Sequence, residues 1–185
     1  MDAFIDIVTD KGEPTGKTAL KSIIHKKGYY HNTIHLWLFT DNGEILLQQR
    51  SRKKAIYPLL WDVSVAGHID AGETFVEAAI RETKEEIGLD LNANDLIKIG
   101  VNRYESSYNN GAILDNEFHH VYITKLNSTI DSLILQKNEV EALKLVSFST
   151  FKNLLEHSAT NGHFISTNLP YYKFVLETIK THSRI

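Results

Sequence analysis

One stretch near the middle of the chain constrains the fold more than any other feature. From Gly67 it reads Gly-His-Ile-Asp-Ala-Gly-Glu-Thr-Phe-Val-Glu-Ala-Ala-Ile-Arg-Glu-Thr-Lys-Glu-Glu-Ile-Gly-Leu. Thr74, with Glu77 three residues later, matches the capping box that starts helices. Gly88 suits the left-handed residue that ends a helix. The pattern therefore predicts a glycine turn followed by a helix over about 75–87.

This expected helix has an acidic face beside a largely apolar stripe. The stripe follows three- and four-residue spacing and comprises Val76, Ala79, Ile80, Thr83 and Ile87. Glu82, Glu85 and Glu86 share a neighbouring face, where like charges repel. A cation removes that repulsion, and carboxylate oxygens suit Mg²⁺ or Mn²⁺. We expect these three glutamates to bind metal, together with the backbone carbonyl of Gly67.

Reduced to its fixed points, the stretch is G-x5-E-x7-R-E-x-x-E-E-x-G. This pattern resembles the signature box of the Nudix hydrolases, and a chance match is on the order of one in a million. Thr83 departs from it, since the family prefers a large apolar residue there. The resemblance implies an α/β fold, a Nudix-type α/β/α sandwich with a mixed β-sheet. The expected catalytic set is Glu85 or Glu117 as the base, with Arg81 and Glu73 as an ion pair that clamps the loop to the helix.

The flanking sequence is similar to one Nudix subgroup, that of type 1 isopentenyl-diphosphate isomerase. The similarity rests on 31–39, on 42–54 and on 57–68, and it covers roughly 20–150. That isomerase has a catalytic cysteine where this chain has Ala66, and this chain has no cysteine. The isomerase also lacks the complete Arg-Glu-x-x-Glu-Glu set. Hydrolysis is therefore favoured over isomerisation.

The same resemblance implies a second, nitrogen-rich metal site. His68 and His31 match metal-binding histidines of the isomerase, and His25 matches a third with an offset of one residue. Asp115 and Glu117 fall on its Glu-x-Glu ligand pair. The alternative is that these histidines simply form local hydrogen bonds or face water.

A basic run follows the second expected strand of a hairpin. Arg50, Arg52 and Lys54 are candidates for binding substrate phosphates that the metals do not reach. The alternative is a solvated basic turn. The tyrosine-containing loop at 104–111 either stacks on the substrate or packs against the protein.

The alternation of strand and helix patterns supports the α/β assignment. Strands are expected at 4–9, 32–40, 44–50, 61–66, 96–105, 117–125 and 143–147, and helices at 18–26, 75–87, 150–157 and 171–181. We expect a single domain overall, with 1–30 an N-terminal extension packed on the core and 31–185 the Nudix hydrolase domain.

Composition and charge limit the classes of partner and the cellular location that fit this chain. A formal net charge of −3 argues against non-specific nucleic-acid binding. The absence of cysteine excludes disulfides and fits a cytoplasmic location. No signal-peptide pattern and no membrane-length apolar run is present. The family resemblance is also compatible with a homodimer.

The resulting hypothesis is a metal-dependent hydrolase of a small-molecule diphosphate. Two or three Mg²⁺ ions would bridge the diphosphate and make water more acidic. Two alternatives stay open: an isomerase of allylic diphosphates, and a non-catalytic Nudix module that senses a nucleotide. The substrate also stays open among nucleoside diphosphates or triphosphates, nucleotide sugars, thiamine-type diphosphates and prenyl diphosphates.

Overall fold

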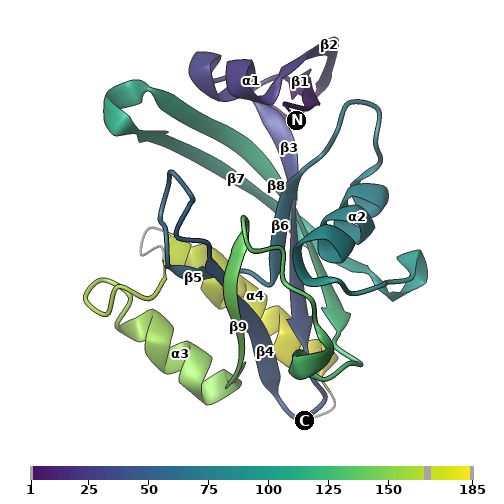
Figure 1. Cartoon of the computed structure of the whole chain (residues 1–185), viewed down its shortest axis with the longest axis vertical. Helices are drawn as coiled ribbons and strands as arrows, with labels where there is room; N and C mark the ends of the chain where they lie inside the picture. The colour runs from purple at the N-terminus through teal and green to yellow at the C-terminus, as the bar shows by residue number, and fades with distance from the viewer. Residues whose placement is uncertain (1, 165–167, 184–185) are drawn as a thin grey trace.

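The computed structural model describes residues 2–164 and 168–183 of the 185-residue chain (Figure 1). The strands are β1 (Phe4–Val8), β2 (Pro14–Leu20), β3 (His31–Phe39), β4 (Glu44–Arg50), β5 (Trp61–Asp62), β6 (Val65–His68), β7 (Ile97–Tyr108), β8 (Ile113–Lys125) and β9 (Val140–Ser147). The α-helices are α1 (Lys21–Lys27), α2 (Phe75–Ile87), α3 (Phe148–Glu156) and α4 (Leu169–His182).

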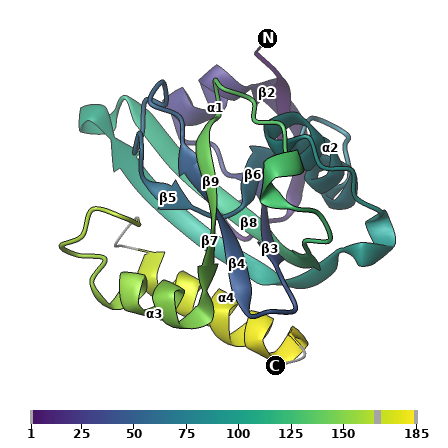
Figure 2. The same cartoon turned by 60° about the horizontal axis from the view of Figure 1, so that its bottom comes forward.

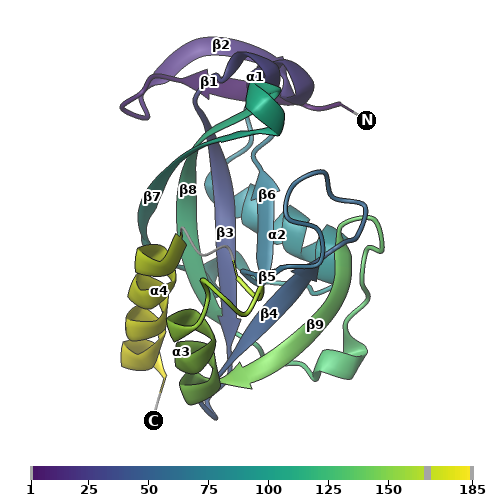
Figure 3. The same cartoon turned by 90° about the vertical axis from the view of Figure 1, so that its left-hand side faces the viewer.

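The strands form one mixed sheet with β3 at its centre. β3 runs parallel to β8 along its whole length and antiparallel to β6. β4 pairs antiparallel with β9 and β5 but meets β3 only at Phe39↔Ile45. β3 and β4 therefore diverge beyond this pair, and Figure 3 shows β4 and β9 leaning away from β3 and β8.

Helices cover both faces of this sheet. On one face, Trp37 packs in a core with Phe151 of α3 and Tyr172 of α4. On the other, Leu36 packs with Ala79 of α2. Figure 2 shows α3 and α4 together on one side of the sheet, with α2 away from them. The predicted α/β sandwich with a mixed sheet is therefore confirmed. Its physical basis is that β3 carries apolar side chains on both faces, as strands covered on both sides do.

The N-terminal segment joins the same sheet. β1 pairs with β2 and also meets β3 at Ile7↔His31, while α1 lies against β8. The division into an N-terminal extension at 1–30, packed on the core, and a Nudix hydrolase domain at 31–185 stays a prediction. No helix in the described ranges is both long and apolar enough to cross a bilayer.

α2 has the predicted bounds and caps. The Thr74 side chain accepts from the backbone of Glu77, the Glu77 side chain accepts in return, and Gly88 has a φ of 70°. The expected stripe is partly wrong, because Val76 and Ile80 are only half-buried whereas Ala78 is fully buried. Thr83 is buried, and its hydroxyl donates to Ala79 O at 2.6 Å, which satisfies the polar group where the family prefers an apolar one.

Thr74→Ala is expected to lower the free energy of unfolding by about 1 kcal/mol, because the backbone N–H of Glu77 loses its cap. Urea unfolding monitored by circular dichroism measures the change. Thr178→Ala, at a half-buried position of α4, removes a hydroxyl that only bonds back to Phe174 O and serves as the matched control. Equal losses in the two variants would show that the cap contributes nothing specific.

Three expected elements differ from those observed. Residues 14–20 form a strand, although the helix was expected to begin at residue 18. The reason is that β1 pairs with this segment as a hairpin, beginning at Phe4↔Leu20. The strand expected at 61–66 splits, since β5 pairs with β4 while β6 pairs with β3. The loop expected after 105 shortens, because β7 and β8 continue pairing to Tyr108↔Ile113 around a turn at Asn109–Gly111.

Candidate functional site

A cavity of about 1200 Å³ lies among β3, β6, β8, α1 and α2. It is bounded on another side by Arg50 and by the loop that follows β4. Its location follows from the divergence of β3 and β4, which leaves the edge of β6 uncovered by a neighbouring strand. The three predicted metal-binding glutamates of α2 line this one cavity, as do His25 and His68 of the three predicted histidines.

The α2 glutamates form the first cluster. Glu82, Glu85 and Glu86 line the cavity with Gly67. The carboxylate of Glu82 occupies the space that a side chain at Gly67 would need, since a Cβ there would lie 2.0 Å from Glu82 Cδ. The absence of a side chain at Gly67 therefore allows Glu82 to lie directly against the backbone of β6.

Arg81 links this cluster to the preceding loop. Its Nε and Nη2 donate to the two carboxylate oxygens of Glu73, each at 2.8 Å, and Nη2 also donates to His68 O at 3.0 Å. Nη1 donates to Glu82 Oε1 at 2.9 Å. The hydrogen bonds to Glu73 are the main cause that raises the pKa of Arg81 above its ordinary value. The predicted ion pair is thus present, and it fixes the loop, β6 and α2 relative to one another.

Glu86 is the most buried member of the cluster, with 4% of its surface exposed. Burial raises the pKa of Glu86 to about 8, against a lowering effect of a hydrogen bond from Gln48. Gln48 on β4 donates to Glu86 Oε2 at 2.8 Å and to Ser64 O at 3.0 Å. Burial also raises the pKa of Glu82. Two buried carboxylates held side by side are suited to a cation, which offsets their desolvation.

The pKa of Glu86 predicts how stability depends on pH when metal is chelated. The unfolded carboxyl ionises near 4.5 and the folded one near 8, so the folded state binds more protons between these values. The contribution of Glu86 to stability should therefore fall as pH rises through this window. Urea unfolding of wild type and Glu86→Gln at several pH values measures it. Parallel stability curves would contradict the shift.

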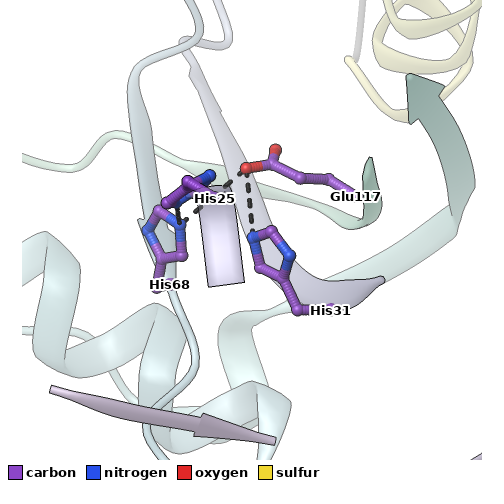
Figure 4. Close-up of side chains that lie close together, drawn as sticks. All are labelled: His25, His31, His68 and Glu117. Carbon is purple, nitrogen blue, oxygen red and sulfur yellow. Dashed lines mark hydrogen bonds and ion pairs between the residues drawn. The ribbon is translucent and has the colours of Figure 1, made fainter. Parts of the chain in front are cut away.

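The second cluster gathers His25, His31, His68 and Glu117, whose ligand atoms all lie within 4.8 Å of one another (Figure 4). They come from α1, β3, β6 and β8. Glu117 Oε1 lies 3.3 Å from His31 Nε2 and 3.8 Å from His68 Nε2, and His25 Nε2 lies 3.0 Å from His68 Nε2. The offset proposed for His25 is therefore accommodated in space, because α1 places this ring over the end of β3.

The electrostatics of this cluster favour a ligand. Burial alone would raise the pKa of Glu117, but the hydrogen bond with His119 and the nearby His31 hold it well below its ordinary value. Burial and the nearby Lys21 lower the pKa of His68 well below its ordinary value, so this imidazole is neutral. Asp115 Oδ1 lies 2.8 Å from His25 Nδ1, without hydrogen-bond geometry. Three imidazoles around a carboxylate are the donor set of a transition-metal site.

The structure separates the three predicted phosphate-binding residues. Arg50 lines the cavity, but its guanidinium already donates to Ile56 O and Tyr57 O. Lys54 also lines the cavity and forms an ion pair with Glu139. Arg52 is outside the cavity lining, is 70% exposed and pairs with Glu141. The first two are placed to meet a ligand, and the third is not.

The tyrosines of the expected loop lie on paired strands. Tyr104 and Tyr108 line the cavity, and their hydroxyls hydrogen-bond to each other. Tyr108 also packs edge-on against Tyr57, with ring centroids 5.5 Å apart. The tyrosines therefore pack on the protein and form a wall of the cavity, and stacking on the substrate stays a prediction.

Sequence reasoning missed two residues that shape the site. Gln48, the partner of Glu86, directly follows the apolar run at 45–47 in β4, and a polar residue at this point of a strand was a usable signal. Lys21 is the second, and it lines the cavity together with His25, which lies one turn later in α1. Its signal was the i,i+4 spacing of the two residues, which places them on one helix face.

Comparisons with known proteins agree with this geometry. A family model described as the NUDIX domain matches residues 29–167. The chain is 39% identical over 157 residues to Nudix hydrolase 3 of Arabidopsis thaliana, covering 83% of this chain and 20% of that protein. It is 35% identical over 159 residues to an uncharacterized Nudix hydrolase of Clostridium acetobutylicum, covering 84% and 75%. The chain thus spans about a fifth of the plant relative and three quarters of the bacterial one.

Two further similarities bear on the subgroup and the fold. The chain is 30% identical over 158 residues to isopentenyl-diphosphate Delta-isomerase 2 of Photorhabdus laumondii, covering 85% of each. The crystal structure of DR0079 from Deinococcus radiodurans superposes with a TM-score of 0.66 at 20% identity, covering 91% of this chain and 98% of that one. The second similarity shows a shared fold.

Proposed function

The chain belongs to the Nudix family, and from this premise we propose that it is a metal-dependent hydrolase that cleaves a diphosphate linkage in a nucleotide-like or other organic diphosphate. The observation that carries the proposal is the convergence of Glu82, Glu85 and Glu86 on one cavity, against the bare backbone of Gly67. The complete glutamate set favours turnover over a sensing role.

The donor set fits Mg²⁺ or Mn²⁺, because all three side chains offer carboxylate oxygens and two of them are desolvated. When bound, the cation would neutralise diphosphate charge and make water more acidic. The Gly67 carbonyl, at the same point of β6, is the proposed backbone ligand. Arg81 holds Glu82 in place, and Glu73 in turn holds Arg81.

We assign the general base to Glu85. Its side chain is 51% exposed at the cavity, so it can reach a water molecule. Glu117, the other candidate, is engaged by His31 and His119, and its lowered pKa makes it a weak base. Arg50 and Lys54 are placed to hold phosphate oxygens at the opposite wall.

A panel of diphosphates tests the proposed function. Nucleoside diphosphates, nucleotide sugars, thiamine diphosphate and prenyl diphosphates are incubated with Mg²⁺ and with Mn²⁺, and release of phosphate or monophosphate is scored. We expect release from one compound class. Tight binding without turnover throughout the panel would favour a sensor and contradict the hydrolase.

An isomerase of allylic diphosphates is the second candidate, and the histidine cluster with Glu117 favours it. Ala66 at the cavity argues against it, because no thiol is available there to transfer a proton. Incubation with isopentenyl diphosphate, followed by detection of its dimethylallyl isomer, separates the two reactions.

We further propose that His25, His31, His68 and Glu117 hold a second metal ion. His68→Gln is expected to lower the Mn²⁺ or Zn²⁺ retained after equilibrium dialysis by one ion per chain, because a nitrogen ligand is lost. His157→Gln, at the exposed end of α3, is the control and should retain the wild-type content. Equal metal content in all three proteins would contradict the site.

A further inference from the structure

The inward face of β3 continues past the histidine cluster with two polar residues that have no assigned role. His31, Thr33 and His35 alternate along this strand and so point to the same side of the sheet. β6 pairs Thr33 with His68 and His35 with Ala66. Thr33, His35 and Ala66 all line the cavity. A polar strip therefore begins at the second cluster and passes the position of Gly67.

Thr33 carries an unpaired hydroxyl. The residue is 4% exposed, and its Oγ1 has no hydrogen-bond partner within the described ranges. Buried hydroxyls are nearly always paired, since leaving one unpaired costs free energy. A side chain of this kind that lines a cavity is available to a ligand.

His35 presents a hydrogen-bond donor to the same cavity. Trp37 Nε1 can only donate, and it donates to Tyr171 Oη at 2.8 Å. The single hydroxyl hydrogen of Tyr171 is then free to donate to His35 Nδ1, also at 2.8 Å. Burial keeps the pKa of His35 well below its ordinary value, so the ring is neutral. A neutral ring that accepts at Nδ1 carries its hydrogen on Nε2.

His119 holds this ring in place without competing for a ligand. The two imidazoles stack with centroids 4.0 Å apart. Both nitrogens of His119 are already engaged, Nε2 with Glu117 Oε2 at 2.8 Å and Nδ1 with Asn102 Nδ2 at 3.3 Å. Of the two stacked rings, His35 is therefore the one with a nitrogen left for the cavity.

We propose that Thr33 and His35 form a subsite that hydrogen-bonds an acceptor atom on the organic group of the diphosphate substrate. The substrate class is then a diphosphate whose organic group is a sugar or a heterocycle, and not a hydrocarbon tail. This inference rests on the proposed function, because it places the diphosphate at Gly67 and the α2 glutamates. Neighbouring strands lie about 5 Å apart, so a group attached to that diphosphate reaches β3.

The test compares catalytic efficiency on polar and hydrocarbon substrates. Wild type should hydrolyse its best polar diphosphate, from UDP-glucose, ADP-ribose and thiamine diphosphate, with a higher kcat/KM than geranyl diphosphate. His35→Leu and Thr33→Val should each lower kcat/KM for the polar substrate by about tenfold or more. Neither should lower kcat/KM for geranyl diphosphate.

Thr33→Val and a control variant keep the test interpretable. Thr33→Val is isosteric and removes an unpaired hydroxyl, so it should fold with an unchanged or higher Tm even if His35→Leu unfolds. His157→Leu, on the exposed end of α3, is the matched control for loss of an imidazole and should leave both efficiencies unchanged.

The outcomes separate this inference from the proposed function. Hydrolysis of geranyl diphosphate alone, or equal losses on both substrates in Thr33→Val, would overturn the polar subsite while leaving the hydrolase intact. Absence of hydrolysis on every compound with Mg²⁺ and Mn²⁺ would overturn both. Selective loss on the polar substrate, with hydrocarbon turnover preserved, supports the subsite.

Discussion

Glu86→Gln is expected to lower kcat by about 10³-fold or more while raising the Tm of the metal-free protein by at least about 2 °C. Activity falls because an amide oxygen is a weak substitute for a carboxylate toward a hard cation. Stability rises because burial raises the pKa of the Glu86 carboxyl to about 8, so that keeping this group in the folded protein at neutral pH costs free energy. The glutamine side chain does not ionise and removes this cost. The retained amide oxygen still accepts from Gln48.

Two measurements on the same samples decide this prediction. Thermal unfolding with chelator, and then with saturating Mg²⁺, should show a metal-dependent increase in Tm for wild type and little or none for Glu86→Gln. Glu177→Gln, a charge-removing change at an exposed position of α4, is the control and should behave as wild type. Near-native turnover of Glu86→Gln under saturating Mg²⁺ would show that Glu86 is not a metal ligand.

Gly67→Ala is expected to lower kcat by about 10²-fold or more, the second large effect. The added Cβ would lie 2.0 Å from Glu82 Cδ and 2.3 Å from Glu82 Oε1, so the Glu82 carboxylate must move. Its hydrogen bond from Arg81 would be lost or distorted with it. The change leaves every charged group in the sequence, and it acts only through position.

Controls for this variant are available within the chain. Gly100→Ala places its Cβ 3.5 Å from Phe174 Cζ, an ordinary contact, and should change neither activity nor Tm. If displacement of Glu82 is the cause, Gly67→Ala with Glu82→Ala should be no less active than Glu82→Ala alone. Additive losses in the double variant would show that Gly67 acts by another route, for example through its carbonyl.

Local sequence was sufficient where short-range interactions decide the structure. α2 has the predicted bounds because its capping box, its acidic face and its terminal glycine lie within one continuous segment. The predicted pairing of Arg81 with Glu73 was also local, since both residues belong to the same loop and helix. The three glutamates share a face for the same reason, because helix geometry alone relates residues at i, i+3 and i+4.

Strand partners decided what sequence reasoning got wrong. Residues 14–20 carry weak strand character, and β1 makes them a strand by pairing with them. The segment 61–66 looks continuous in sequence, but β3 and β4 diverge and take separate parts of it. Propensity is a weak guide in such segments, because the energy of a strand comes from its neighbours.

The sequence by itself determined α2, its acidic face and the family to which the chain belongs, because these features lie within one continuous motif. The family resemblance proposed a site of His25, His31, His68 and Glu117, but only the tertiary structure decided that they meet, since they come from four different elements. The tertiary structure also decided that Gln48 holds Glu86, and that Thr33 and His35 lie beside Ala66. These contacts depend on strand register, and a register is set by the packing of the whole sheet.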